Sequence, residues 1–197
     1  MDFVPPAAGS YKLERIQRAS DGSVLDTAGR RRRLDEFTGG KVTLLAFMYA
    51  SCADPTGCPY AFTVMHEVKN ALERLPQTRG RVRFVSLSFD PVRDTPAALA
   101  LYGGSQADAG QHVEWTFLTT RSRRQLLPIL AGFGQDVGVD IDRASGKPVG
   151  TYSHVLKVFL IDRHHAVREI YTVDYLLPAM VLNDILTLLM EEGLARK

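Results

Sequence analysis

The sequence has no apolar run of the roughly 18 to 20 residues that a membrane-spanning helix needs. Its first residues, from Met1 to Pro5, lack the basic start and apolar stretch of a secretion signal. It also lacks an excess of one charge, since 24 Lys and Arg against 22 Asp and Glu leave a net charge of +2. We therefore expect a soluble chain that does not bind nucleic acid, and its 197 residues suffice for one domain with a full core.

Cysteine is equally scarce, and its two positions carry most of the functional information. Cys52 and Cys58 are separated by five residues, among which Pro55 and Gly57 favour a turn. A structural disulfide across so small a loop would stabilise the chain by only about 2 kcal/mol. A redox pair is an equal alternative on spacing alone. A metal site ranks third, because two thiolates under-fill a zinc site, although two thiolates with one imidazole suit copper.

The chain around this pair alternates between strand and helix patterns. Nearly continuous apolar runs predict buried strands over 42–49 and 82–89, with a third strand over 113–118. Helical spacing follows the first strand, with Pro59 in the first turn. The cysteines therefore lie in a loop from strand to helix, where free backbone N–H groups at the helix start favour a thiolate.

The second half adds antiparallel elements to this pattern. Residues 134–153 predict an inserted hairpin, and His154 to Asp162 predicts a strand that pairs with the chain leading to Tyr171. A last helix begins at Pro178. This order resembles that of an α/β protein with a thioredoxin-like fold, in which helices flank a central mixed sheet. We divide the chain into an irregular N-terminal extension with a hairpin, residues 1–33, and a single domain, residues 34–197.

Four stretches, in order, resemble the Sco/SenC family of copper proteins. They are Leu44 to Cys52 (LLAFMYASC), Cys58-Pro59, Ser88 to Pro96 (SFDPVRDTP), and His154 with Asp162 eight residues later. The resemblance extends from about Gly29 onward. It implies that Cys52, Cys58 and His154 bind copper, as Cu(I) or Cu(II), and that Asp90 has a supporting role at the site.

The resemblance also implies a function and a place of work. Family members serve the assembly of the binuclear copper centre of respiratory cytochrome oxidase, so the implied partner is the subunit that carries this centre, or another copper or thiol protein. They usually face the periplasm or another oxidising compartment, tethered by an N-terminal membrane segment that this sequence does not contain. Such a protein is a metallochaperone first, rather than an enzyme.

This sequence departs from the family at two places. The family usually has three residues between its cysteines, where this chain has five, and it more often has an acidic residue where Tyr152 and Ser153 precede His154. The rival hypothesis is a thiol-disulfide oxidoreductase or thiol peroxidase that uses Cys52 and Cys58, with His154 only packing nearby. A third is a degenerate member that keeps the fold and a structural disulfide.

Overall fold

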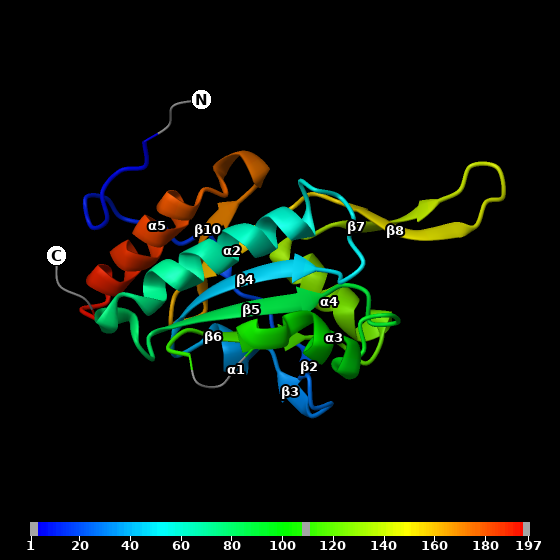
Figure 1. Cartoon of the computed structure of the whole chain (residues 1–197), viewed down its shortest axis with the longest axis horizontal. Coiled ribbons are helices and arrows are strands. Elements are labelled where there is room, and N and C mark those ends of the chain that lie inside the picture. Colours follow the sequence, from blue (N-terminus) through cyan, green and yellow to red (C-terminus); the bar gives the residue numbers. More distant parts are fainter. Residues whose placement is uncertain (1–3, 108–110, 195–197) are drawn as a thin grey trace.

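A mixed sheet forms the centre of the computed structural model, which describes residues 4–107 and 111–194. Six strands lie in the order β1, β10, β9, β4, β5, β6 (Figure 1). Their bounds are Gln17–Arg18 for β1, Val42–Met48 for β4, Val82–Ser88 for β5, Glu114–Leu118 for β6, Val158–Ile161 for β9 and Ala166–Tyr171 for β10. β4, β5 and β6 are parallel, whereas β9, β10 and β1 run antiparallel to their neighbours. The predicted fold class, a mixed sheet flanked by helices, is confirmed.

Helices cover both faces of this sheet, and successive side chains of β4 point alternately to one face and to the other. Phe47 points to α4, where its ring packs against Phe133 at 5.4 Å between centroids. Its neighbour Met48 lines a small internal cavity with Cys58 and Met65 of α2, and α5 packs beside α2 on that side (Figure 1). The helices and 3-10 turns are α1 (Asp35–Thr38), α2 (Cys58–Glu73), η1 (Pro76–Thr78), α3 (Pro96–Gly103), η2 (Gly104–Ala107), α4 (Arg123–Phe133), η3 (Val173–Tyr175) and α5 (Pro178–Glu191).

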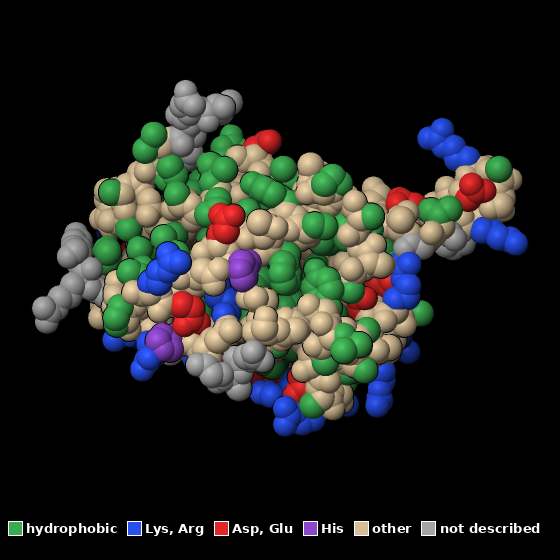
Figure 2. Space-filling model, in the orientation of Figure 1, with side chains coloured by type: hydrophobic (Ala, Val, Ile, Leu, Met, Phe, Trp, Pro, Cys, Tyr) green, Lys and Arg blue, Asp and Glu red, His purple; other side chains and the backbone are tan. Residues whose placement is uncertain are grey.

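Two hairpins lie outside the main sheet. β2 (Ser23–Leu25) pairs with β3 (Arg31–Arg33), and β7 (Val137–Ile141) pairs with β8 (Pro148–His154). The β7–β8 hairpin projects from the body (Figure 1), and Lys and Arg side chains extend from opposite sides of its tip (Figure 2).

The strand predicted from His154 to Asp162 is wrong at its start. β8 ends at His154, which pairs with Val137 of the hairpin, and β9 begins only at Val158. Between them Val155 is 61% exposed, whereas Leu156 is buried in the core. The chain therefore turns from one sheet into the other within an apolar run that, in the sequence, looks continuous.

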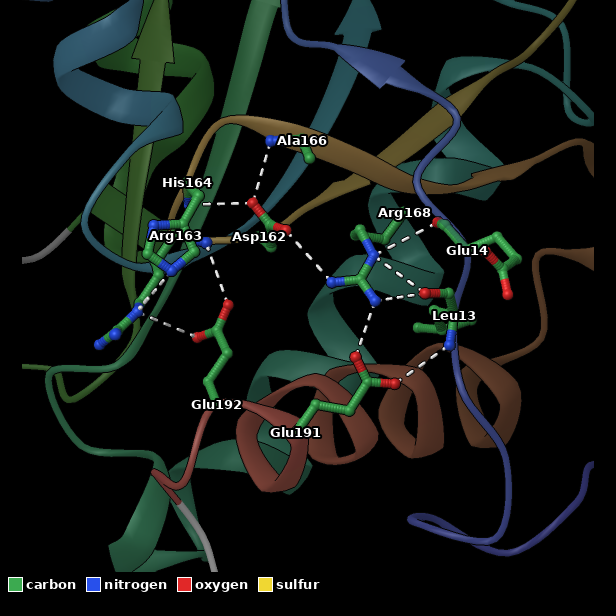
Figure 3. A network of polar contacts seen from close by, with 9 residues as sticks. All are labelled: Leu13, Glu14, Asp162, Arg163, His164, Ala166, Arg168, Glu191 and Glu192. Carbon is green, nitrogen blue, oxygen red and sulfur yellow. Dashed lines mark hydrogen bonds and ion pairs between the residues drawn. The ribbon is translucent and has the colours of Figure 1, made fainter.

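The segment before β1 is held to the body by a polar network centred on Arg168 (Figure 3). The Arg168 guanidinium donates to the carbonyl oxygen of Leu13, and it pairs with Asp162 at 3.2 Å and with Glu191 of α5 at 2.7 Å. The domain boundary at residue 33 stays a prediction. β1, which precedes that boundary, is already a strand of the main sheet. Asp162 also accepts the backbone N–H groups of His164 and Ala166, so it shapes the turn from β9 to β10.

Within 4–107 and 111–194, no helix is long and apolar enough to cross a bilayer.

Candidate metal centre

The loop from β4 to α2 brings both cysteines to the carboxyl ends of the parallel strands. The Cys52 N–H donates to the Tyr49 carbonyl at 3.2 Å, and Cys58 is the first residue of α2. Between them Asp54 organises the loop: its carboxylate accepts the Thr56 N–H at 2.9 Å and the Thr56 hydroxyl at 2.8 Å, and its carbonyl accepts the Gly57 N–H. The five residues between the cysteines thus form a turn with its own hydrogen bonds.

Cys58 and His154, which are 96 residues apart in sequence, meet at this loop. The Cys58 Sγ lies 3.9 Å from the His154 Nε2. The other ring nitrogen, Nδ1, lies 3.3 Å from the Tyr152 carbonyl oxygen. Because a carbonyl oxygen only accepts, Nδ1 must carry the proton in this contact, which leaves the Nε2 lone pair directed at the thiol. This is the tautomer in which a histidine binds a metal through Nε2.

The two thiols have different environments. Both are free, but Cys58 is 2% exposed whereas Cys52 is partly exposed. Burial, with added contributions from the charge and hydrogen bond of Cys52, raises the pKa of Cys58 to about 12. The expectation that the helix start favours a thiolate is therefore wrong for Cys58, because loss of water outweighs the backbone N–H groups there.

Three aromatic side chains form a cluster beside His154, and none of them was predicted as a site residue from the sequence. Phe89 lies 4.9 Å and Tyr49 6.2 Å from the imidazole, measured between ring centroids, and Tyr152 contacts both of these rings at 5.5 and 5.2 Å. Burial and a hydrogen bond to Cys52 also raise the pKa of Tyr49 to about 12. The signal that could have found two of them is position, since Tyr49 and Phe89 directly follow parallel strands.

Asp90 is 1% exposed and lies beside this cluster rather than between the thiols. Its backbone N–H donates to the Ser88 hydroxyl at 2.9 Å, and its carboxylate pairs with Arg93. The Arg93 guanidinium lies over the Tyr152 ring, 5.6 Å from the centroid. Burial and a hydrogen bond to Asp90 raise the pKa of Tyr152, and Arg93 lowers it. The predicted supporting role of Asp90 stays a prediction, but its partners are now defined.

Asp94 connects the cysteine loop to the end of β5. Its Oδ2 accepts the Ala50 N–H at 3.0 Å and the Ser88 hydroxyl at 2.5 Å, and burial raises the pKa of its carboxyl group. The N-cap of α3 is the next residue, Thr95, whose hydroxyl accepts the Ala98 N–H at 3.2 Å.

Cys52, Cys58 and His154 offer donor atoms of the types that bind soft metals, but the three are not grouped as a metal site. In residues 4–107 and 111–194, no three His, Cys, Asp or Glu side chains are grouped closely enough to hold a metal ion. Cys58 and His154 form a facing pair, and hydrogen bonding links Cys52 to Cys58 and to Tyr49. Two thiolates with one imidazole are donor types that suit copper.

Comparisons with known proteins point to one family. The family model described as SCO1/SenC matches residues 16–190. A comparison with curated proteins found no match. Among solved structures, copper-bound ScoI of Bradyrhizobium japonicum is 21% identical, with a TM-score of 0.66 over 85% of this chain and 97% of the other.

Two further structures are similar over most of their length. A SCO1/SenC family lipoprotein from Bacillus anthracis is 21% identical, with a TM-score of 0.64 over 92% of this chain and 97% of the other. BsSco, described as having a disulfide switch and as a member of the Sco family of cytochrome c oxidase assembly proteins, is 19% identical, with a TM-score of 0.66 over 90% and 98%. With sequence identities of 19% to 21%, the similarity to these three structures shows that the fold is shared.

Proposed function

The chain belongs to the SCO1/SenC family, and on this basis we propose that it is a copper metallochaperone. In this proposal Cys52, Cys58 and His154 hold copper as cargo, and the protein delivers it to the copper centre of cytochrome c oxidase during assembly. Copper-bound ScoI and the oxidase assembly protein BsSco have the same fold, which supports the proposal. Under this hypothesis the chain is a binding protein rather than an enzyme.

One observation carries the proposal: the Cys58 Sγ and the His154 Nε2 face each other at 3.9 Å, with the Nδ1 proton held by the Tyr152 carbonyl. Thiolates are soft ligands for Cu(I), and imidazole accepts both Cu(I) and Cu(II). Because the pKa of Cys58 is about 12, this thiol keeps its proton near neutral pH until copper displaces it. Cargo binding therefore releases a proton, and copper affinity rises with pH.

Unequal burial of the two thiols favours delivery. Cys58 is buried, whereas Cys52 and His154 are both partly exposed. A partner thiol or imidazole can replace an accessible ligand such as Cys52 first while the other two ligands still hold the ion. Cargo then passes to the partner by ligand exchange, without release of free copper.

The proposal is tested by titrating the fully reduced protein with Cu(I) under anaerobic conditions against a competing chelator. The wild type should compete for one Cu(I) per chain. Cys58→Ser and His154→Ala should each lower the affinity strongly, whereas His164→Ala, in the exposed turn between β9 and β10, is the matched control and should bind as wild type. If the wild type binds no better than the ligand variants, the protein is not a copper carrier.

A second candidate is thiol-disulfide exchange, favoured by the pairing of an exposed and a buried cysteine. The Cys52 thiolate would attack a partner disulfide to form a mixed disulfide, and Cys58 would then displace the reduced partner. Two electrons pass to the partner, and the Cys52–Cys58 disulfide remains. Equilibration with glutathione buffers measures the reduction potential of the Cys52–Cys58 disulfide. If Cys58→Ser turns over a disulfide substrate as fast as the wild type does, the paired mechanism is excluded.

We also propose that the protein works in the periplasm or another oxidising compartment, tethered to the membrane. The similar Bacillus anthracis protein is a lipoprotein, which supports a tether. Fractionation of cells that express the full-length protein, followed by protease treatment of intact spheroplasts, tests this directly. Recovery in the cytosolic fraction, protected from protease, would exclude the proposed location.

A further inference from the structure

His154 lies at the base of a hairpin that is not part of the main sheet. It is the last residue of β8 and pairs only with Val137 of the projecting hairpin, outside the six-stranded sheet (Figure 1). The Cys58 thiol, by contrast, is fixed at the start of a 16-residue helix packed on that sheet. The distance between Sγ and Nε2 therefore depends on whatever holds the base of the hairpin to the body.

Tyr152 is the residue placed to do this. It lies two positions before His154 on the same strand, so both side chains point to the same face. Its ring packs against Tyr49 and Phe89, at 5.2 and 5.5 Å between centroids, and these residues follow the ends of β4 and β5. Its carbonyl oxygen accepts the His154 Nδ1 proton at 3.3 Å. Displacement of Tyr152 would thus move the imidazole and release its fixed tautomer together.

An ion pair between the buried Asp90 and the partly exposed Arg93 also contacts Tyr152. Asp90 is 1% exposed, and its ion pair with Arg93 compensates the cost of burying its charge. The Arg93 side chain, 43% exposed, places its guanidinium over the Tyr152 ring at 5.6 Å. Such a contact between a cation and an aromatic ring joins the loop after β5 to the hairpin.

We propose that Asp90, Arg93 and Tyr152 form a latch that positions the His154 Nε2 opposite the Cys58 thiol. The three are positioning residues, and none of them is a ligand in this proposal. The inference rests on the proposed copper function for its consequence, since a loosened imidazole would bind copper less tightly. Its geometric content, the tautomer and place of His154, can be measured without metal.

The metal-free experiment follows the His154 ring by nitrogen NMR in the reduced protein. In the wild type Nδ1 should carry the proton, and Nε2 should show the shift of an unprotonated nitrogen. Arg93→Gln should mix the tautomers and speed exchange of the ring proton with water. Arg93→Lys, which keeps the cation, should restore the wild-type pattern in part. Arg121→Gln removes an arginine from an exposed position before α4, and as the matched control it should leave the ring unchanged.

The copper arm uses the same variants in the competition titration. Loss of a residue that orients a metal-binding histidine typically lowers metal affinity by about 10- to 100-fold, and we expect about tenfold for Arg93→Gln. Tyr152→Leu should lose a similar amount. The double variant should lose no more than either single change, because both act through the same contact. Tyr152→Phe keeps the ring and should lose less than Tyr152→Leu.

The outcomes separate the latch from the copper hypothesis. A wild-type ring pattern and wild-type affinity in Arg93→Gln, with copper still lost in His154→Ala, would overturn the latch and leave the copper function standing. Failure of the wild type to hold copper would overturn the function, while the NMR comparison would still decide the latch. If Arg93→Gln does not fold, Tyr152→Leu carries the same comparison, and an unchanged His154 ring in that variant would refute the latch.

Discussion

The two thiols should differ greatly in reactivity, and this difference can be worked from the structure. Burial raises the pKa of Cys58 from the ordinary thiol value of 9.0 to about 12. At pH 8 its thiolate fraction is then about a thousandfold smaller than that of an ordinary thiol, and only the thiolate attacks an alkylating reagent. Cys58 is also 2% exposed, so access slows the reaction further.

Iodoacetamide labelling of the reduced, metal-free protein at pH 8 measures this difference. Mass spectrometry of peptides after timed quenching gives one rate for each cysteine. Cys52 should be labelled first, and Cys58 at least about a thousandfold more slowly than in guanidinium, where its environment is lost. Because its folded pKa is raised, the Cys58 rate should climb tenfold per pH unit from pH 8 upward, without levelling near pH 9.

Two results would refute this reasoning. Comparable rates for Cys58 in the folded and unfolded protein would mean that the thiol is neither buried nor held protonated. A Cys58 rate that levels below pH 9 would mean that the helix start stabilises the thiolate after all. The single variants Cys52→Ser and Cys58→Ser assign each rate, and the slow rate should persist in Cys52→Ser because burial is the largest cause of the shift.

Three further predictions concern stability and the cysteine loop. Tyr171→Phe removes a hydroxyl that donates to the buried Asp184 at 2.7 Å, and urea unfolding should show a loss of about 1 to 3 kcal/mol; no loss would mean that the carboxyl group finds another donor. Phe47→Ala opens a cavity between β4 and α4 and should lower the free energy of unfolding by about 3 to 5 kcal/mol in the same assay, so a loss below about 1 kcal/mol would contradict the assigned packing. Asp54→Ala removes the carboxylate that accepts both Thr56 hydrogen bonds in an exposed turn, so stability should change by less than about 0.5 kcal/mol. Amide exchange at Thr56 should nevertheless become faster, and unchanged exchange would show that the carboxylate does not order the turn.

The sequence was sufficient for elements with strong local patterns. β4 is a continuous apolar run and is buried at all seven positions, and α2 follows it with apolar residues at helical spacing. Because the cysteine loop lies between these two elements, its place at the end of the sheet followed directly. The pairing of Cys58 with His154 came from the family resemblance, since nothing local connects residues 96 positions apart.

The errors arose where long-range contacts decide the outcome. The apolar run after His154 looks like one strand in the sequence. In the structure His154 pairs within the hairpin, whereas the residues from Val158 onward pair with the main sheet. The Cys58 pKa was misjudged because the helix start is visible in sequence and the burial is not. No sequence pattern pairs Arg93 with Tyr152, since the two residues lie on distant segments of the chain.

The large sequence separation between Cys58 and His154 makes the candidate centre a late product of folding. Closing so long a loop costs entropy that only the assembled sheet and hairpin can offset. An incomplete or unfolded chain carries the two cysteines but lacks the imidazole beside them. A metal that needs all three ligands would therefore bind the finished fold alone and stabilise it by mass action. Under the proposed function, only chains that have completed folding would therefore bind copper.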